Sequence, residues 1–195
     1  SGRLLAEINV QTGNTHSERL MPQVEQLFGL AGAVQSDVAA LAVSIGPGSF
    51  TGLRIGLTTA KTLAYAWGKP IVGAPTLEAL AYGCPCADGW VAALLDAQKG
   101  RVYRAIYRWQ AGRLCEVSPV EIAPATAVVA ELAALPAPVM LVGESVREHR
   151  ALIDATNGRV VAAPEAALMP RAAVVALLGY DKWQQGRAVR PEERN

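Results

Sequence analysis

Apolar and polar side chains recur along this chain with two different periods, which predict strands and helices in turn. Residues 3–10 alternate between apolar and polar side chains, the pattern of a strand with one buried face. Apolar residues then return at helical spacing, which predicts a helix over residues 16–28. Residues 38–45 are a short, almost continuous apolar run, typical of a strand that is buried on both faces.

The remainder of the chain continues this alternation. Predicted strands cover residues 71–73, 90–95, 101–109, 114–122, 139–142 and 159–162. Predicted helices cover residues 52–67, 76–81, 126–135, 146–155 and 171–185. A turn at residues 97–100 joins two of the strands as a hairpin. Strands and helices in alternation, with hairpins among them, indicate an α/β protein with mixed sheets flanked by helices.

Glycine and proline gather in residues 82–89, between a predicted helix and a predicted strand. Such residues mark loops, so this stretch is the best candidate for a boundary between two lobes. We therefore expect a first lobe over residues 1–88 and a second lobe over residues 89–195. The last helix of the chain can pack back on the first lobe.

A glycine-rich turn, Gly-Pro-Gly-Ser over residues 46–49, lies between a predicted strand and a predicted helix. A turn of this kind presents free backbone N–H groups, which can bind a phosphate. The candidate contacts for a nucleotide or another anion are Gly46, Gly48, Ser49 and Arg54.

Two known phosphate-binding patterns do not fit this turn. The P-loop requires Lys-Ser/Thr where Leu53-Arg54 stands, and the dinucleotide fingerprint requires a third glycine where Thr51 stands. Ser49 or Thr51 can also cap the following helix, because a hydroxyl oxygen accepts a hydrogen bond from its first backbone N–H groups. Anion binding and helix capping therefore both stay open for this turn.

The helix after the turn carries a stripe of small residues at every fourth position, flanked by leucines. The stripe and its flanks consist of Gly52, Gly56, Ala60, Ala64, Leu53, Leu57 and Leu63. Because glycine inside a helix costs about 1 kcal/mol relative to alanine, two glycines in one stripe indicate that another element approaches closely. That element is either this chain's own sheet or a helix of another subunit. Arg54, Lys61 and Tyr65 fall on the opposite, polar face.

Charge and length exclude some classes of function. The chain has 195 residues and a formal net charge of +1, with acidic and basic residues mixed along it. The absence of a basic block gives no support for tight RNA binding by this chain alone. No segment reaches the ~18 apolar residues that span a bilayer, so we expect no contact with membranes.

The cysteines point to a reducing compartment. Cys84, Cys86 and Cys115 are odd in number, and a Cys-Pro-Cys pair does not match the spacing of a zinc knuckle. Reduced thiols are the ordinary state of such residues in the cytosol. We therefore expect a cytoplasmic protein.

The sequence offers no catalytic or metal site. His16 and His149 are the only two histidines and have no ligand cluster around them, so we predict no metal site. No Ser-His-Asp or Cys-His arrangement is visible, and we predict no catalytic residue. Asp96 precedes the turn at residues 97–100, where its carboxylate can cap backbone N–H groups or, alternatively, bind a nucleotide or a metal.

Four stretches of the sequence resemble the TsaB (also called YeaZ) family. The most distinctive is SIGPGSFTGLRIGLTTAKTLAYAWGKPIVGAPTLEALA, which begins at Ser44. The others are NTHSERLMPQVEQLF, LLDAQKGRVYRAIYRW and LVGES, and together they cover nearly the whole chain in the family's order. The start departs from the family, which opens with a strand and an Asp-Thr-Ser/Thr turn. This sequence lacks that hairpin partner for residues 3–10.

The resemblance implies a duplicated actin-like, Hsp70-like ATPase (ASKHA) fold with two lobes. It also implies a non-catalytic subunit that binds and activates TsaD, which forms threonylcarbamoyladenosine next to the tRNA anticodon. The small ATPase TsaE would join the complex, and tRNA would be contacted only within it. The alternative is an autonomous ATP-binding and ATP-hydrolysing enzyme of the same fold. A metallopeptidase, a label used in the wider superfamily, does not suit two isolated histidines.

The resemblance places the contact with TsaD on the helices over residues 16–28 and 52–67. The expected interface consists of His16, Leu20, Val24, Leu27, Gly52, Leu53, Gly56, Leu57, Ala60 and Leu63. A surface that binds a partner's helix can also bind the same surface of a second copy of this chain, so we expect a homodimer when the chain is alone. No tightly bound cofactor is expected, and ATP or ADP at the interface with TsaD stays open.

Overall fold

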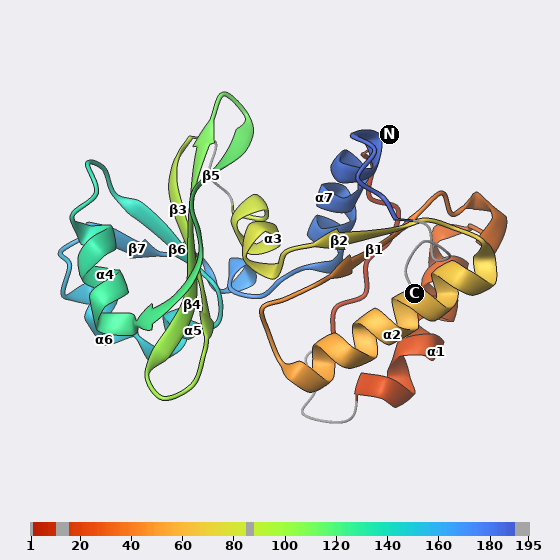
Figure 1. Cartoon of the computed structure of the whole chain (residues 1–195), viewed down its shortest axis with the longest axis horizontal. Helices are drawn as coiled ribbons and strands as arrows, with labels where there is room; N and C mark the ends of the chain where they lie inside the picture. Colours follow the sequence, from red (N-terminus) through yellow and green to blue (C-terminus); the bar gives the residue numbers. More distant parts are fainter. Residues whose placement is uncertain (1, 11–15, 85–87, 190–195) are drawn as a thin grey trace. The chain divides into compact units, whose positions relative to one another are not determined.

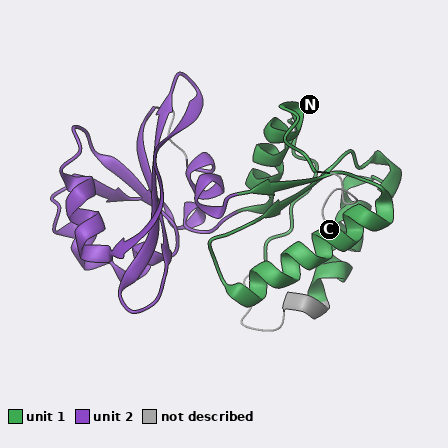
Figure 2. Ribbon diagram, viewed as in Figure 1, with its two compact units in different colours: residues 1–74, 171–195 green, residues 75–170 purple. Residues whose placement is uncertain are grey.

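The computed structural model describes residues 2–10, 16–84 and 88–189, and the side chains of all of them except residues 16–18. The chain forms two compact units, which Figure 2 distinguishes by colour. Each unit has its own sheet, covered by helices, as the alternating pattern of the sequence predicts.

The division between the units differs from the expected lobes of residues 1–88 and 89–195. Unit 1 comprises residues 1–74 and 171–195, and unit 2 comprises residues 75–170. The reason for the earlier boundary is α3 (Thr76–Tyr82), which packs against strands of unit 2. The last helix, α7 (Ala172–Gln184), does return to the first part of the chain.

Unit 1 contains a small parallel sheet between helices. In this sheet β1 (Leu41–Ser44) pairs with β2 (Ile71–Ala74), and the 3-10 helix η1 (Gln35–Asp37) precedes it. In Figure 1, α2 (Phe50–Trp67) lies on one side of the sheet and α7 on the other. The helix α1 (His16–Ala31) packs beside α2. The predicted helices at residues 16–28 and 52–67 are thus confirmed.

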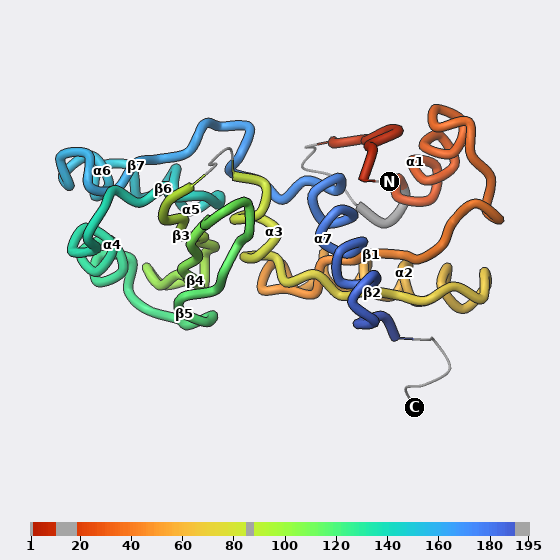
Figure 3. Tube along the Cα trace, turned by 90° about the horizontal axis from the view of Figure 1, so that it is seen from above, coloured from red at the N-terminus to blue at the C-terminus, as the bar shows by residue number. Residues whose placement is uncertain are grey.

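The contact between α7 and β1 is unusually close. Gly179 of α7 is buried, and a Cβ atom added to it would lie 2.4 Å from the Cβ atom of Ala42. Carbon atoms that are not bonded cannot approach to that distance, so Gly179 is the residue that lets the helix reach the strand. Figure 3, seen from above, shows α7 lying over β1 and β2.

Unit 2 is built on a five-stranded mixed sheet in the order β5-β4-β3-β6-β7. Its strands are β3 (Gly89–Asp96), β4 (Arg101–Gln110), β5 (Arg113–Pro124), β6 (Val139–Val142) and β7 (Val160–Ala162). The first three are antiparallel neighbours, whereas β6 and β7 run parallel to β3. Besides α3, its helices are α4 (Ala125–Ala133), α5 (Ser145–Glu148), α6 (Arg150–Asp154) and the 3-10 helix η2 (Glu165–Ala167).

Two side chains of β4 fix helices to opposite faces of this sheet. The Arg104 guanidinium contacts the carboxylates of Glu121 on β5 at 2.8 Å and of Glu131 on α4 at 3.3 Å. The Trp109 indole N–H donates a hydrogen bond to the carbonyl oxygen of Ala81 on α3 at 3.2 Å. Strand residues separated by an odd number of positions point to opposite faces. Thus α4 covers one face and α3 the other (Figure 1).

Two expectations of local structure are wrong. Residues 3–10 form no strand, because a strand requires a neighbour for its backbone groups and the described part of the chain provides none there. The helix expected over residues 146–155 is broken into α5 and α6 at His149, whose φ of −107° and ψ of 18° are not helical. The other predicted strands and helices are present, with shifts of a few residues at their ends.

Glu7 joins the N-terminal segment to the start of α7. Its carboxylate accepts hydrogen bonds from the Arg171 guanidinium and, at 2.9 Å, from the Ala173 backbone N–H. Burial raises the pKa of Glu7, but hydrogen bonds from Arg171, Ala173 and Asn9 outweigh it, so the pKa lies below its usual value. The carboxylate therefore caps the helix as an anion, where the N-terminal end of the helix dipole favours negative charge.

Gly179→Ala should lower the free energy of unfolding by about 1–3 kcal/mol, because the added methyl group overpacks the contact with Ala42. Urea denaturation followed by circular dichroism measures the change. Gly56→Ala is the matched control, since it makes the same substitution within α2, where a Cβ atom meets nothing within 4 Å. Equal losses of stability at the two positions would contradict the close contact of α7 with β1.

Glu7→Gln should cost about 1 kcal/mol of stability near neutral pH, the usual effect of losing a helix cap. The pKa of Glu7 is lower in the folded chain than its usual value of 4.5, so its carboxylate stabilises the fold above that pH. This contribution is lost as the pH falls through the folded pKa. Unfolding curves of both proteins between about pH 7 and about pH 3 should therefore converge in acid. A difference that stays constant over this range would refute the capping role.

Candidate functional site

The glycine-rich turn ends where α2 begins, and Ser49 is the N-cap of that helix. Its hydroxyl oxygen accepts a hydrogen bond from the Gly52 N–H at 3.3 Å. Gly46 has a φ of 101°, a conformation that favours glycine. Helix capping by Ser49 is confirmed. Contacts of Gly46, Gly48, Ser49 and Arg54 with a nucleotide or another anion stay a prediction.

Helices α1 and α2 form the part of unit 1 on which the contact with TsaD is predicted. Phe28 of α1 meets Trp67 of α2 edge to face, with ring centroids 5.8 Å apart. His16 is the first residue of α1, and its side chain lies outside the described residues. Three other predicted interface residues of α1 are half-buried: Leu20, Val24 and Leu27.

The stripe of small residues on α2 divides into two halves. Ala60 is 9% exposed and Ala64 has no exposed surface, so this half packs inside the chain. A Cβ atom on Gly56 would meet nothing within 4 Å, and one on Gly52 would meet only its cap, Ser49, at 3.6 Å. Internal packing is therefore confirmed for the two alanines. A partner's helix stays a prediction for the two glycines. The flanking residues are all half-buried: Leu53, Leu57 and Leu63.

The opposite face of α2 carries aromatic and basic side chains. Phe50 and Tyr65 are each 73% exposed. The Arg54 guanidinium lies 4.9 Å from the centroid of the Phe50 ring, and Lys61 is exposed on the same side. At 3.6 residues per turn these four side chains fall within one stripe. We call this stripe the exposed face of α2.

The exposed face of α2 has the composition of a protein-binding surface. Exposed aromatic and arginine side chains are the ones that most often contribute binding energy at interfaces. Helical spacing in the sequence predicted Arg54, Lys61 and Tyr65 on this face as polar positions, but Phe50 was not predicted there. Its spacing of four residues from Arg54 could have revealed it, because such residues are neighbours on a helix.

Two titratable residues of unit 2, Asp96 and Tyr107, have surroundings that suit a structural role better than a catalytic one. The Asp96 carboxylate accepts a hydrogen bond from the Gln98 N–H at 2.8 Å, which confirms it as a turn cap. Burial, followed by the charges of Glu116 and Glu78, raises the pKa of Tyr107 far above its usual value. The phenol therefore stays protonated and cannot serve as a base.

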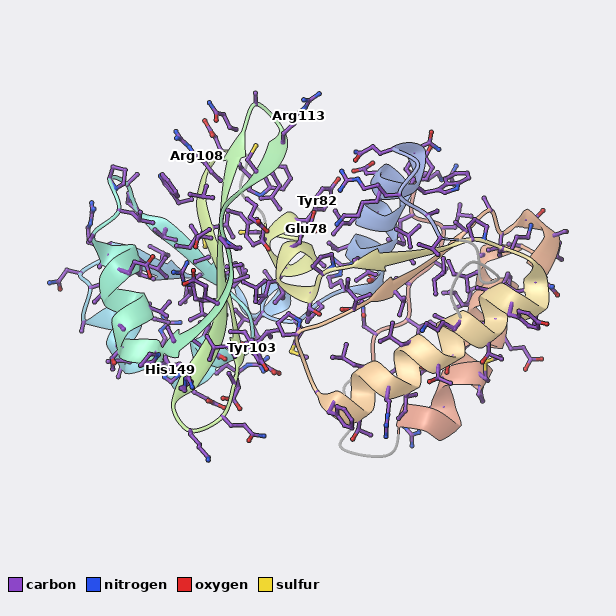
Figure 4. The ribbon with its side chains drawn as sticks, viewed as in Figure 1. Glu78, Tyr82, Tyr103, Arg108, Arg113 and His149 are labelled. Atoms are coloured by element: carbon purple, nitrogen blue, oxygen red, sulfur yellow. The ribbon has the colours of Figure 1, made fainter. Side chains whose placement is uncertain are left out.

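The polar side chains labelled in Figure 4 come from separate parts of unit 2. They are Glu78 and Tyr82 on α3, Arg108 and Arg113 near the turn between β4 and β5, and Tyr103 and His149 toward the opposite end of the strands. Within the described ranges, no group of three or more His, Cys, Asp or Glu residues could hold a metal. Cys84 is buried and Cys115 is exposed, and Cys86 lies outside the described residues.

No helix in the part of the chain that the structure describes is both long enough and apolar enough to cross a membrane.

Comparison with known proteins identifies relatives over most of the chain. Residues 9–175 match the family model TsaD, described as tRNA N6-adenosine threonylcarbamoyltransferase. The tRNA threonylcarbamoyladenosine biosynthesis protein TsaB of Bacillus subtilis (strain 168) is 33% identical over 182 residues, which cover 92% of this chain and 79% of that protein. The protein of the same name from Escherichia coli (strain K12) is 40% identical over 95 residues, 48% of this chain and 41% of that protein.

Two solved structures have a fold similar to that of this chain. A crystal structure of an uncharacterised Pseudomonas aeruginosa protein with similarity to peptidase YEAZ has a TM-score of 0.77 and 29% identity, covering 92% of this chain and 82% of that chain. YeaZ from Pseudomonas aeruginosa has a TM-score of 0.73 and 29% identity, covering 91% and 81%. The fold is thus the expected α/β, actin-like fold with mixed sheets flanked by helices. Within that class, the chain belongs to the TsaB (YeaZ) family.

Ala60→Leu should lower the free energy of unfolding by about 1–3 kcal/mol, because the larger side chain has no room at a buried position. Gly56→Leu, four residues earlier on the same stripe, should leave stability unchanged or raise it by up to about 1 kcal/mol, because leucine favours the helix more than glycine does. Urea unfolding of both variants measures the contrast. Similar losses in both would contradict the division of the stripe into a packed half and an open half.

Proposed function

We propose that this protein is a non-catalytic subunit that binds and activates TsaD in the formation of threonylcarbamoyladenosine next to the tRNA anticodon. Membership of the TsaB family is the observation that carries the proposal, since the Bacillus subtilis and Escherichia coli relatives are named tRNA threonylcarbamoyladenosine biosynthesis proteins. The match to the TsaD family model over residues 9–175 agrees with a shared ancestry of this chain and the transferase.

A supporting role agrees with the surroundings of the candidate catalytic groups. Asp96 caps a turn, and the Tyr107 phenol stays protonated. Arg104 is held by the carboxylates of Glu121 and Glu131 within the sheet and helix layers of unit 2. Asp96 and Arg104 already have structural partners, which favours binding to another protein over chemistry as the task of the chain.

The contact with TsaD in this proposal uses α1 and α2 of unit 1. Open space at Gly56 lets the backbone of a partner's helix approach closely, and a Cβ atom on Gly52 would meet only Ser49 of the same chain. TsaE joins this heterodimer, and tRNA is bound only by the assembled complex. Without TsaD, the same helices pair two copies of this chain.

The chain holds no cofactor tightly in this proposal, and ATP or ADP would be bound at the interface with TsaD. The turn at residues 46–49 adjoins the first turn of α2, so Gly46, Gly48, Ser49 and Arg54 are the candidate contacts. The competing function is an autonomous ATPase of the actin-like fold. The same turn at a helix N-terminus is the feature that favours it.

Reconstitution separates the two functions. TsaD, TsaE, the adenylate-forming enzyme, threonine, bicarbonate, ATP and unmodified tRNA are combined with and without this chain. Modification of tRNA should require the chain, and the chain alone should neither hydrolyse ATP nor modify tRNA. Modification that proceeds equally well without it would refute the subunit role. Magnesium-dependent ATP hydrolysis by the isolated chain would support the competing enzyme.

Gly56→Leu should weaken binding to TsaD and self-association at least about tenfold, because a side chain now fills the space left for a partner's helix and costs about 1.4 kcal/mol or more of binding energy. Light scattering after gel filtration measures the homodimer, and calorimetry with TsaD measures the heterodimer. Ala130→Leu, at an exposed position of α4 in unit 2, is the control and should change neither. Normal association of Gly56→Leu would remove α2 from the assigned interface.

A further inference from the structure

An apolar groove of about 600 Å³ lies in unit 1, between α2 and the two strands of the sheet. Its apolar lining comes from β1 and the residue that follows it, from β2 and from α2, and includes Val43, Ile45, Leu57, Ala64 and Ile71. Ile45 is 49% exposed although it belongs to this apolar lining. The volume is that of a typical pocket for a small molecule, about 300–1,000 Å³.

The margin of the groove carries a cation and a phenol. Lys61 and Tyr65 of α2 line it, and both are exposed. The lining contains no acidic residue. Among the described residues, no salt bridge involves Lys61. The groove thus combines apolar walls with a positive charge that has no carboxylate partner in the described part of the chain.

We propose that this groove binds an anionic amphiphile, a small molecule with an alkyl body and a carboxylate head. The alkyl body lies between Val43, Ile45 and Leu57, where burial of apolar surface favours it. The carboxylate pairs with the Lys61 ammonium and accepts a hydrogen bond from the Tyr65 hydroxyl. A charged pair beside apolar walls is screened less than one in open water, so the head group adds both affinity and selectivity for an anion.

The chain itself argues against an extended peptide as the occupant. The edge of β2 that borders the groove is already paired, because the Ile71 N–H donates to Val189 at 2.9 Å and the Val189 N–H donates back to Ile71 at 3.0 Å. A peptide strand cannot add to the sheet at that position without displacing Val189. A small molecule needs no backbone partner and fits beside the existing pairing.

This site goes beyond the proposed subunit role and does not depend on it. Leu57 also belongs to the predicted interface with TsaD or with a second copy of the chain, so the test uses the isolated chain, diluted until light scattering shows a monomer. Failure of amphiphile binding would leave the subunit role untouched. Failure of tRNA modification would equally leave this site standing.

Calorimetric titration of the whole chain with dodecanoate, below its micelle concentration, tests the proposal. Dodecyltrimethylammonium, with the same alkyl chain and the opposite charge, is the matched probe. We expect one dodecanoate per chain, at least about tenfold tighter binding than the cation, and weaker binding as salt increases. Equal affinity for the two probes, or no binding of dodecanoate, would overturn the proposal.

Lys61→Met tests the head group, because it keeps the alkyl stem of the side chain and removes only the charge. It should weaken dodecanoate binding about tenfold and leave the thermal unfolding temperature unchanged, as expected for an exposed side chain. Lys99→Met, an exposed lysine in the turn between β3 and β4, is the control and should not change binding. Unaltered affinity in Lys61→Met would refute the assigned contact.

Methyl NMR locates the alkyl chain independently of these variants. Dodecanoate should shift the methyl signals of Val43, Ile45 and Ile71. Shifts confined to the exposed methyl groups of β5, such as those of Val117 and Val120, would place binding elsewhere and overturn the proposal.

Discussion

The close packing of α7 against β1 is the contact on which unit 1 depends. A sheet of two short strands is marginal in water, so it persists here only because helices cover its faces. One of those helices comes from the far end of the sequence, and it reaches the strand because Gly179 lies against Ala42. Glu7 caps the start of that helix. Unit 1 therefore contains contacts between segments that are far apart in the sequence.

Unit 2 is continuous in sequence and has its own hydrophobic core. Several of its polar side chains join its strands to each other and to its helices. Arg104 joins β4 to β5 and α4, Trp109 joins β4 to α3, and Asp96 closes a hairpin turn. Buried and partly buried polar groups are stable when they are paired, which is the case for these contacts. These polar contacts therefore join the sheet of unit 2 to its helices and close one of its hairpins.

The helix α2 belongs both to the packed interior of unit 1 and to the predicted interface, because one side of the helix is buried and another is exposed. Ala60 and Ala64 pack inside unit 1, which fixes the rotation of the helix about its axis. That rotation leaves open space at Gly56 and turns Phe50 and Tyr65 outward. Lys61 then comes to the margin of the apolar groove. The proposed contact with a partner and the proposed binding of an amphiphile thus both depend on one orientation of a single helix.

The periodicity of the sequence predicted most strands and helices, because burial on one face imposes a spacing that can be read without coordinates. It failed for residues 3–10, where alternation alone cannot supply a pairing neighbour, and at His149, where the backbone leaves the helix. The motifs predicted the family and the two helices of the candidate interface. They could not divide the stripe between its packed alanines and open glycines, or reveal the groove. Those features arise from side chains distant in sequence, such as Val43, Leu57 and Ile71, and depend on how the elements pack.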